Sequence, residues 1–444
     1  MEYIFFIACL ILLIWLLSYG IASLDALPGR LQNKCDKEGK PDDPRQINRP
    51  GHLGNVLRIR LTNNGSFIDR CELTDVLYEL NWDSPRAARG FGARRKPDAI
   101  SLPKFIVLYI HGWKHSASNN DTDLLNFTKA ISRLNQVNAT DKQVLGVYVG
   151  WNATSKAPFF DRFPLNNLTF WSRQRVADRI AQSGVITKIL SSISAVLSDG
   201  DRSDENQFIA IGHSFGARIL FSGASQPLIY DTQRAHPGCP GEVYKMIHGI
   251  ANAVILLNPA FEAARYTALD AITRIEEKFA DNQLPLLLAI SSKGDWATKT
   301  AFPIGQLVGS YKSETERTTL GNYSKYQTHS LQIANSEISD ASGLNDLSEN
   351  FAAGGLRLTR DRASGNDCGR TAGSEPRIVQ LRNPFLIAST TPKIIRDHND
   401  IWNERFAEWL FAYINELGNR RRPRLLDDAK GISPDGAGAQ ATTA

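Results

Sequence analysis

The chain has 444 residues, of which 42% are hydrophobic, and it carries a formal net charge of +5. This length and apolar content predict a large folded domain. The basic residues are scattered and the net charge is mild, so nucleic acid is not expected as a partner. Five cysteines are too few for a disulfide framework.

The first segment, residues 3–24, is uncharged and mostly apolar. Its length is close to the ~20 residues that span a bilayer. No lysine or arginine precedes it, unlike a secretory signal, and five basic residues follow it within positions 30–45. The positive-inside rule therefore favours a single-pass membrane anchor at residues 1–24, with the following domain on the cytoplasmic side.

The alternative is an exported domain. Cleavage of a signal peptide after Ala22 or Ala26 would release the chain outside the membrane. A disulfide between Cys35 and Cys71 would then be feasible, because such bonds persist in oxidising compartments. The sequence leaves both topologies open.

The remaining chain divides by composition. Residues 25–52 are rich in proline and charge and are expected to be a linker. Residues 53–426 carry the apolar runs of the folded domain. Residues 427–444 are rich in glycine, alanine and threonine and are expected to be disordered.

Local patterns predict several elements ahead of the motifs. One or two early antiparallel strands are expected within residues 55–82. A long amphipathic helix is expected at about 171–197. Another helix is expected from five apolar residues that share one helical face, Leu124, Leu125, Phe127, Ile131 and Leu134.

A buried strand is predicted at residues 105–110, and it ends in His111-Gly112-Trp113. His111 and His115 have a spacing that metal ligands use on helices. Here the two histidines flank a strand-to-loop junction, and no cysteine or carboxylate cluster joins them. No metal or other cofactor is therefore expected.

The most informative motif is Gly212-His213-Ser214-Phe215-Gly216, which ends an apolar run that begins at Phe208. This pattern predicts a strand that turns sharply into a helix. Glycines at both ends avoid steric clashes in that turn and leave Ser214 on a strained, exposed point. Ser214 is thus the candidate nucleophile, with a helix N-terminus behind it. His213 is expected to be structural.

A nucleophilic serine needs a base, and the base needs an acid to orient it. Asp295 follows a predicted strand at residues 286–291, and His398 follows another at 385–390. The chain order Ser214, Asp295, His398 is typical of one class of hydrolases.

Other residues compete for these roles. Glu262 is the alternative acid, and His329, in a polar segment, is a weak alternative base. Asp400 lies too close in sequence to His398 to orient it and is expected to cap the next helix.

An oxyanion hole requires two backbone N–H groups that point at the developing charge. The candidates are Phe215, directly after the nucleophile, and Trp113, in the earlier loop. Gly112 would let the backbone approach the reacting carbon closely.

These motifs resemble the α/β-hydrolase superfamily over roughly residues 100–415. The resemblance implies an α/β fold with a mostly parallel central sheet and helices on both faces, and hydrolysis of acyl or related bonds through a covalent serine intermediate. This sequence itself carries a large insertion at about 297–383, of which residues 313–375 are polar and poorly patterned. We expect the substrate to be a carboxylic ester, either a small molecule or a lipid. A thioesterase, an amidase, an acyltransferase and a catalytically silent binding protein on the same fold are the alternatives.

Overall fold

The structure is a computed structural model. The predicted anchor at residues 3–24 lies outside the described residues except for Leu13, and so do the linker at 25–52 and the tail at 427–444. The described residues are 13, 53–81, 102–138, 141–153, 170–198, 203–236, 244–273, 279–302, 313–334, 346–361 and 382–420.

The described residues build one ten-stranded sheet. Neighbouring strands are parallel from β1 to β7, and β7, β9 and β8 are joined by antiparallel pairs. In spatial order the strands are β1 (Val56–Leu61), β3 (Gln143–Trp151), β2 (Lys104–Ile110), β4 (Gln207–His213), β5 (Ala253–Leu257), β6 (Leu287–Ser292), β10 (Phe385–Thr390), β7 (His329–Ile333), β9 (Leu356–Arg360) and β8 (Asn350–Ala353). The predicted α/β class with a mostly parallel sheet is confirmed.

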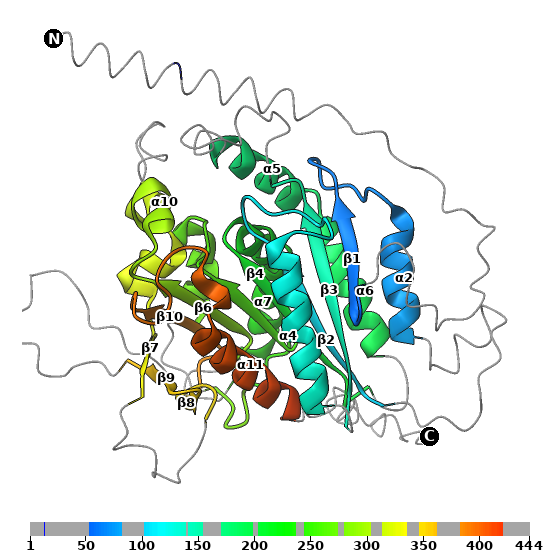
Figure 1. The fold of residues 1–444 in the computed structure, drawn as a ribbon. Coiled ribbons are helices and arrows are strands. Elements are labelled where there is room, and N and C mark those ends of the chain that lie inside the picture. The colour runs from blue at the N-terminus through cyan, green and yellow to red at the C-terminus, as the bar shows by residue number, and fades with distance from the viewer. Residues whose placement is uncertain are drawn as a thin grey trace, which may run out of the picture.

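Helices cover both faces of the sheet (Figure 1). One face packs against α2 (Arg70–Asn81), α5 (Phe170–Gln182), α6 (Val185–Leu197), α7 (Phe215–Ala235) and α8 (Thr267–Thr273). The other face packs against α4 (Thr122–Asn138) and α11 (Glu404–Asn419). Short helical turns complete the domain: η3 (Ala263–Tyr266), η4 (Ala297–Ala301), α10 (Glu314–Arg317), η5 (Leu320–Asn322), η6 (Ser324–Tyr326) and η8 (Asp400–Trp402).

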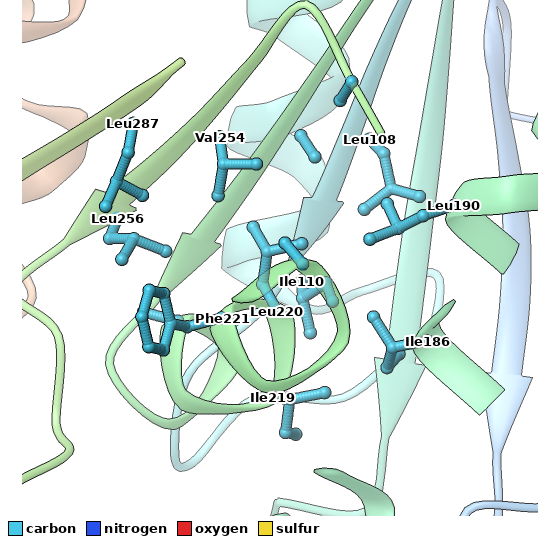
Figure 2. Packing of buried hydrophobic residues seen from close by; sticks show 14 of the residues in the cluster. Leu108, Ile110, Ile186, Leu190, Ile219, Leu220, Phe221, Val254, Leu256 and Leu287 are labelled. Carbon is cyan, nitrogen blue, oxygen red and sulfur yellow. The ribbon is translucent and has the colours of Figure 1, made fainter. Parts of the chain in front are cut away.

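The central strands are uninterrupted apolar runs because they are covered on both faces. Every residue of β2, β4, β5, β6 and β10 is buried. Helix α7 packs against this central region, and its apolar side chains meet those of the strands and of α6 (Figure 2). The labelled members of this core are Leu108, Ile110, Ile186, Leu190, Ile219, Leu220, Phe221, Val254, Leu256 and Leu287.

The early segment differs from the prediction of antiparallel strands. β1 is an edge strand that pairs in parallel with β3, and residues 70–81 form α2. The apolar residues Leu73, Val76 and Leu80 of α2 are spaced three and four residues apart and are buried against the sheet, which is a helical spacing. Cys71 in this helix is disulfide-bonded, and the other four cysteines lie outside the described residues.

The long helix predicted at about 171–197 is two helices, α5 and α6, which meet at an angle of 48°. Gly184 separates them with a φ of 73°, a left-handed conformation that ends a helix. Among the described residues, no single helix is long and apolar enough to cross a membrane. The bent pair of α5 and α6 taken together has the length and the composition that a membrane span needs.

Helix α4 buries Leu124, Phe127, Ile131 and Leu134, whereas Leu125 is 38% exposed. The prediction that Leu125 shares the buried face is therefore wrong. A position one residue after Leu124 is rotated by about 100° around the helix axis, which carries its side chain away from the sheet.

The polar insertion predicted at about 297–383 contributes β7, β9 and β8, which extend the sheet beyond β10. These strands bury alternate residues, among them Leu331, Phe351, Leu356 and Leu358, under α11. Strands of four or five residues give a weak sequence signal, and three of the five positions in β7 and in β9 are polar, so these strands were not predicted.

Candidate active site

The residues singled out from the sequence meet at the carboxyl edge of the sheet, which is the usual location of sites in parallel α/β proteins. Ser214 directly follows β4, and Asp295 follows β6 by three residues. His398 lies in the loop between β10 and α11, and Trp113 lies in the loop after β2.

The turn at Ser214 is as tight as the glycine spacing predicts. A Cβ at Gly216 would lie 2.1 Å from the Ile110 carbonyl oxygen, and one at Gly212 would lie 2.7 Å from the Ala217 Cα. Ser214 itself has φ 56° and ψ −118°, which is strained for a residue with a side chain. The Ser214 N–H donates to the Leu257 carbonyl at 3.0 Å, and this bond ties the strained residue to β5.

Ser214 is strained but not exposed, so the predicted exposure is wrong. Only 1% of its surface is accessible. His398 contacts the hydroxyl on one side, and Gly112 closes another side, because a Cβ there would lie 3.0 Å from the Ser214 Cβ. These neighbours come from other loops of the folded chain, which a turn motif alone does not reveal.

Ser214, His398 and Asp295 form a continuous hydrogen-bonded chain. The His398 Nε2 lies 2.6 Å from the Ser214 Oγ, and the His398 Nδ1 lies 2.7 Å from the Asp295 Oδ2. A carboxylate only accepts, so Nδ1–H donates to Asp295 and the bare Nε2 accepts from the serine hydroxyl. In this arrangement His398 is oriented to take the proton of Ser214.

Asp295 is fully buried and ionised. Burial by itself would raise its pKa, but His398 and two hydrogen bonds from Thr298 outweigh that effect and hold the pKa below its ordinary value of 3.8. The Thr298 backbone N–H donates at 3.1 Å and its hydroxyl at 2.7 Å. Sequence reasoning missed Thr298, although its position three residues after an aspartate is a common capping spacing.

The two predicted oxyanion donors flank the nucleophile. Phe215 is the first residue of α7, where backbone N–H groups have no partner within the helix and the helix dipole favours negative charge. Trp113 follows Gly112 in the loop after β2. The ring of Phe170 packs on both residues, with centroids 5.4 Å from Trp113 and 4.9 Å from Phe215. This contact fixes the loop after β2 relative to the first turn of α7.

The alternative acid, Glu262, is engaged elsewhere. Its carboxylate pairs with Arg218 and with Arg265, each at 3.0 Å. The alternative base, His329, begins β7 and is buried, and its Nε2 donates to the Ser348 carbonyl at 2.8 Å. Both residues therefore lie in networks of their own.

Asp400 does not cap the following helix, contrary to the sequence prediction. Asn403 is the N-cap of α11, and its side chain accepts from the Phe406 N–H at 3.1 Å. Asp400 instead accepts from the Arg396 N–H at 2.9 Å within the His398 loop. The helix begins three residues later than expected because η8 intervenes.

His111 has both ring nitrogens occupied by protein groups. Its Nδ1 donates to the Gly112 carbonyl at 2.9 Å, and its Nε2 accepts from the Trp151 N–H at 3.0 Å. Burial lowers its pKa to about 4, so the ring is neutral. The part of the chain that the structure describes holds no group of three or more histidine, cysteine or acidic residues placed to bind a metal ion.

Comparison with models of known protein families found no match, and neither did comparison with curated proteins. Among solved structures, the chain is similar to phospholipase PlaB from Legionella pneumophila in complex with thio-NAD, at 14% sequence identity and a TM-score of 0.28. The match covers 71% of this chain and 61% of that chain, so this chain spans less than two thirds of its length. A similarity at this TM-score says nothing about the function of this chain.

Proposed function

We propose that this protein is a serine hydrolase of the α/β-hydrolase type that cleaves carboxylic esters. The observation that carries the proposal is the hydrogen-bonded chain from Ser214 through His398 to the buried Asp295. The strained backbone at Ser214 supports it, because strain in a sharp turn between a strand and a helix is typical of nucleophile positions.

The reaction follows from the positions of these groups. The Ser214 Oγ attacks the ester carbonyl carbon while its proton passes to the His398 Nε2. The backbone N–H groups of Phe215 and Trp113 stabilise the oxyanion. The bond to the alcohol oxygen then breaks, and His398 returns the proton to that oxygen. Asp295 stabilises the imidazolium throughout and keeps its own charge.

The second half of the reaction regenerates the enzyme. His398 removes a proton from water, whose oxygen attacks the acyl carbon. The bond to Ser214 Oγ breaks, the proton returns to that oxygen, and a carboxylic acid leaves. The same groups could act in a thioesterase, an amidase or an acyltransferase, which differ in the leaving group or in the acceptor of the acyl group. Activity assays on these substrate classes distinguish the ester hydrolase from the alternatives.

The direct test compares the wild type with Ser214→Ala on p-nitrophenyl esters of increasing acyl length. We expect kcat to fall by about 10⁶-fold, since removal of the nucleophile disables the whole chain of groups. Ser191→Ala is the matched control, because this exposed hydroxyl on α6 bonds, among the described residues, only to the Lys188 carbonyl of its own helix. Turnover that survives Ser214→Ala would sink the assignment.

We further propose that residues 3–24 attach the protein to a membrane. The segment lies outside the described residues, so its sequence alone supports this proposal. The disulfide at Cys71 favours the exported side for the domain, against the charge pattern after the segment. Deletion of residues 1–26 should release an active, soluble enzyme from the membrane fraction, and protease treatment of intact spheroplasts reports the side. An intact chain after that treatment would place the domain in the cytoplasm.

A further inference from the structure

The carbonyl oxygen of His398 is held by two buried side chains from neighbouring strand ends. The His213 Nε2 lies 2.9 Å from this oxygen, and the Asn258 Nδ2 lies 3.0 Å from it. His213 is 1% exposed and Asn258 is fully buried. Neither residue contacts the Ser214 hydroxyl, so both act on the backbone of His398 and not on the reacting atoms.

His213 is fixed as a donor. A carbonyl only accepts, so the proton of the neutral ring lies on Nε2. Burial and the nearby His398 lower the pKa of His213 to about 3, which keeps the ring neutral. Its Nδ1, which has no hydrogen-bond partner among the described residues, faces Gly112, where an added Cβ would lie 2.7 Å away.

The side chain of Asn258 connects His398 to the end of strand β6, which leads to Asp295. Its Nδ2 donates to His398, while its Oδ1 accepts from the Ser292 N–H at 3.0 Å, three residues before Asp295. Its backbone has a φ of 43°, a left-handed conformation that asparagine tolerates better than most residues. One buried amide therefore bridges the His398 loop and the end of β6.

The His398 loop is partly exposed, and the buried side chains of Ile394 and Ile395 anchor its middle, so His213 and Asn258 fix the backbone at His398 itself. His398 lies eight residues beyond the end of β10, and residues 391–393, 396, 397 and 399 of the loop are exposed. The same loop accepts a further hydrogen bond, because the Ser292 hydroxyl donates to the Ile395 carbonyl at 2.5 Å. The imidazole reaches Ser214 only if its backbone stays in place.

We propose that His213 and Asn258 are positioning residues that hold His398 at hydrogen-bonding distance from Ser214. This inference rests on the proposed hydrolase function. Loss of either bond lets the His398 loop shift, and small misplacements of a base are costly because proton transfer needs close alignment. We expect kcat to fall and KM to change little, because neither side chain contacts the reacting atoms.

A matched pair of variants at position 213 tests the bond itself. A glutamine amide nitrogen reaches about as far from the backbone as the histidine Nε2, whereas an asparagine amide nitrogen reaches only as far as Nδ1. His213→Gln therefore keeps a donor for His398, and His213→Asn loses it. We expect His213→Asn to lower kcat about tenfold and His213→Gln to stay within about threefold of wild type. Asn258→Gly, which tolerates the left-handed backbone, should resemble His213→Asn.

Two readouts separate positioning from a general loss of folded protein. First, kcat is expressed per site titrated with a fluorophosphonate, so that unfolded molecules are not counted. Second, His213→Asn is repeated in a His398→Ala background, where we expect no further loss of residual activity per folded molecule. A purely structural role would reduce activity equally in both backgrounds.

Three results would overturn the inference: an unchanged kcat per titrated site in His213→Asn, equal losses in the two position-213 variants, or the same loss in the His398→Ala background. A wild type that neither reacts with the fluorophosphonate nor hydrolyses esters is a different failure. It overturns the proposed function itself, and the positioning role with it.

Discussion

Asp295 and Glu262 lie in the loops after two neighbouring strands, β6 and β5, and both are largely buried carboxylates with different partners. Asp295 accepts from His398, whereas Glu262 pairs with Arg218 and Arg265. Burial by itself would raise the pKa of each carboxyl, and in each case the partners lower it below its ordinary value. Burial and pKa therefore do not distinguish a carboxylate that is paired with a histidine from one that is paired with arginines.

The difference lies in what each partner can do with a proton. An imidazole accepts and releases one during a reaction, whereas a guanidinium keeps its proton. Arg218 is 3% exposed and joins Glu262 to Asp178, and Arg265 contacts the same two carboxylates. This four-residue cluster links α5, the first turns of α7 and η3, and it secures the helix that directly follows Ser214.

The largest expected contrast is in turnover. Asp295→Asn should lower kcat by about 10⁴-fold, because the amide no longer holds the His398 tautomer that accepts from Ser214. Glu262→Gln, the matched change in the neighbouring loop, should leave kcat per titrated site within about threefold of wild type. Steady-state kinetics on one p-nitrophenyl ester measures both. If the Glu262 variant is the inactive one, the acid has been misassigned.

The next contrast is in stability. Arg218→Met should lower the free energy of unfolding by about 3–5 kcal/mol, since it removes the buried one of the two cations that Asp178 and Glu262 share and leaves only the more exposed Arg265. Arg420→Met is the control, because Arg420 forms a more exposed pair with Glu416 in α11 and should cost under about 0.5 kcal/mol. Urea unfolding measures the two variants. Equal losses would show that the cluster adds no stability beyond that of a surface pair.

The smallest contrast is in the pH dependence of stability. The pKa of Glu262 is lowered on folding, so its contribution is complete above its ordinary value of 4.5 and is lost as the pH falls through the folded value. Glu262→Gln should therefore be about 2 kcal/mol less stable than wild type at pH 7. The gap should close progressively below about pH 4.5 in unfolding curves. A gap that is constant from pH 7 to pH 3 contradicts the charged pairing.

The strands and their end residues were predictable because their signals are local. Long apolar runs mark β2, β4, β6 and β10, and each is followed closely by the residue types that a hydrolase site requires. The glycines around Ser214 predicted a tight turn, and the close approach of Gly216 to the Ile110 carbonyl confirms it. Such inferences need only the sequence within a few residues.

Features that depend on distant parts of the chain were not predictable. Asn258 donates a hydrogen bond to His398, which lies 140 positions away, and no local sequence pattern predicts that bond. The burial of Ser214 arises from loops after β2 and β10. The break between α5 and α6 is different, since Gly184 within a helical pattern was a visible signal of interruption.

The central claim is that Ser214 is a nucleophile activated by His398. Labelling with a fluorophosphonate followed by peptide mapping tests it most directly, because the adduct identifies the reacting oxygen. We expect one adduct on Ser214 in the wild type, none in Ser214→Ala, and labelling slowed by orders of magnitude in His398→Ala. An adduct on another residue, or an unchanged labelling rate in His398→Ala, would contradict the claim.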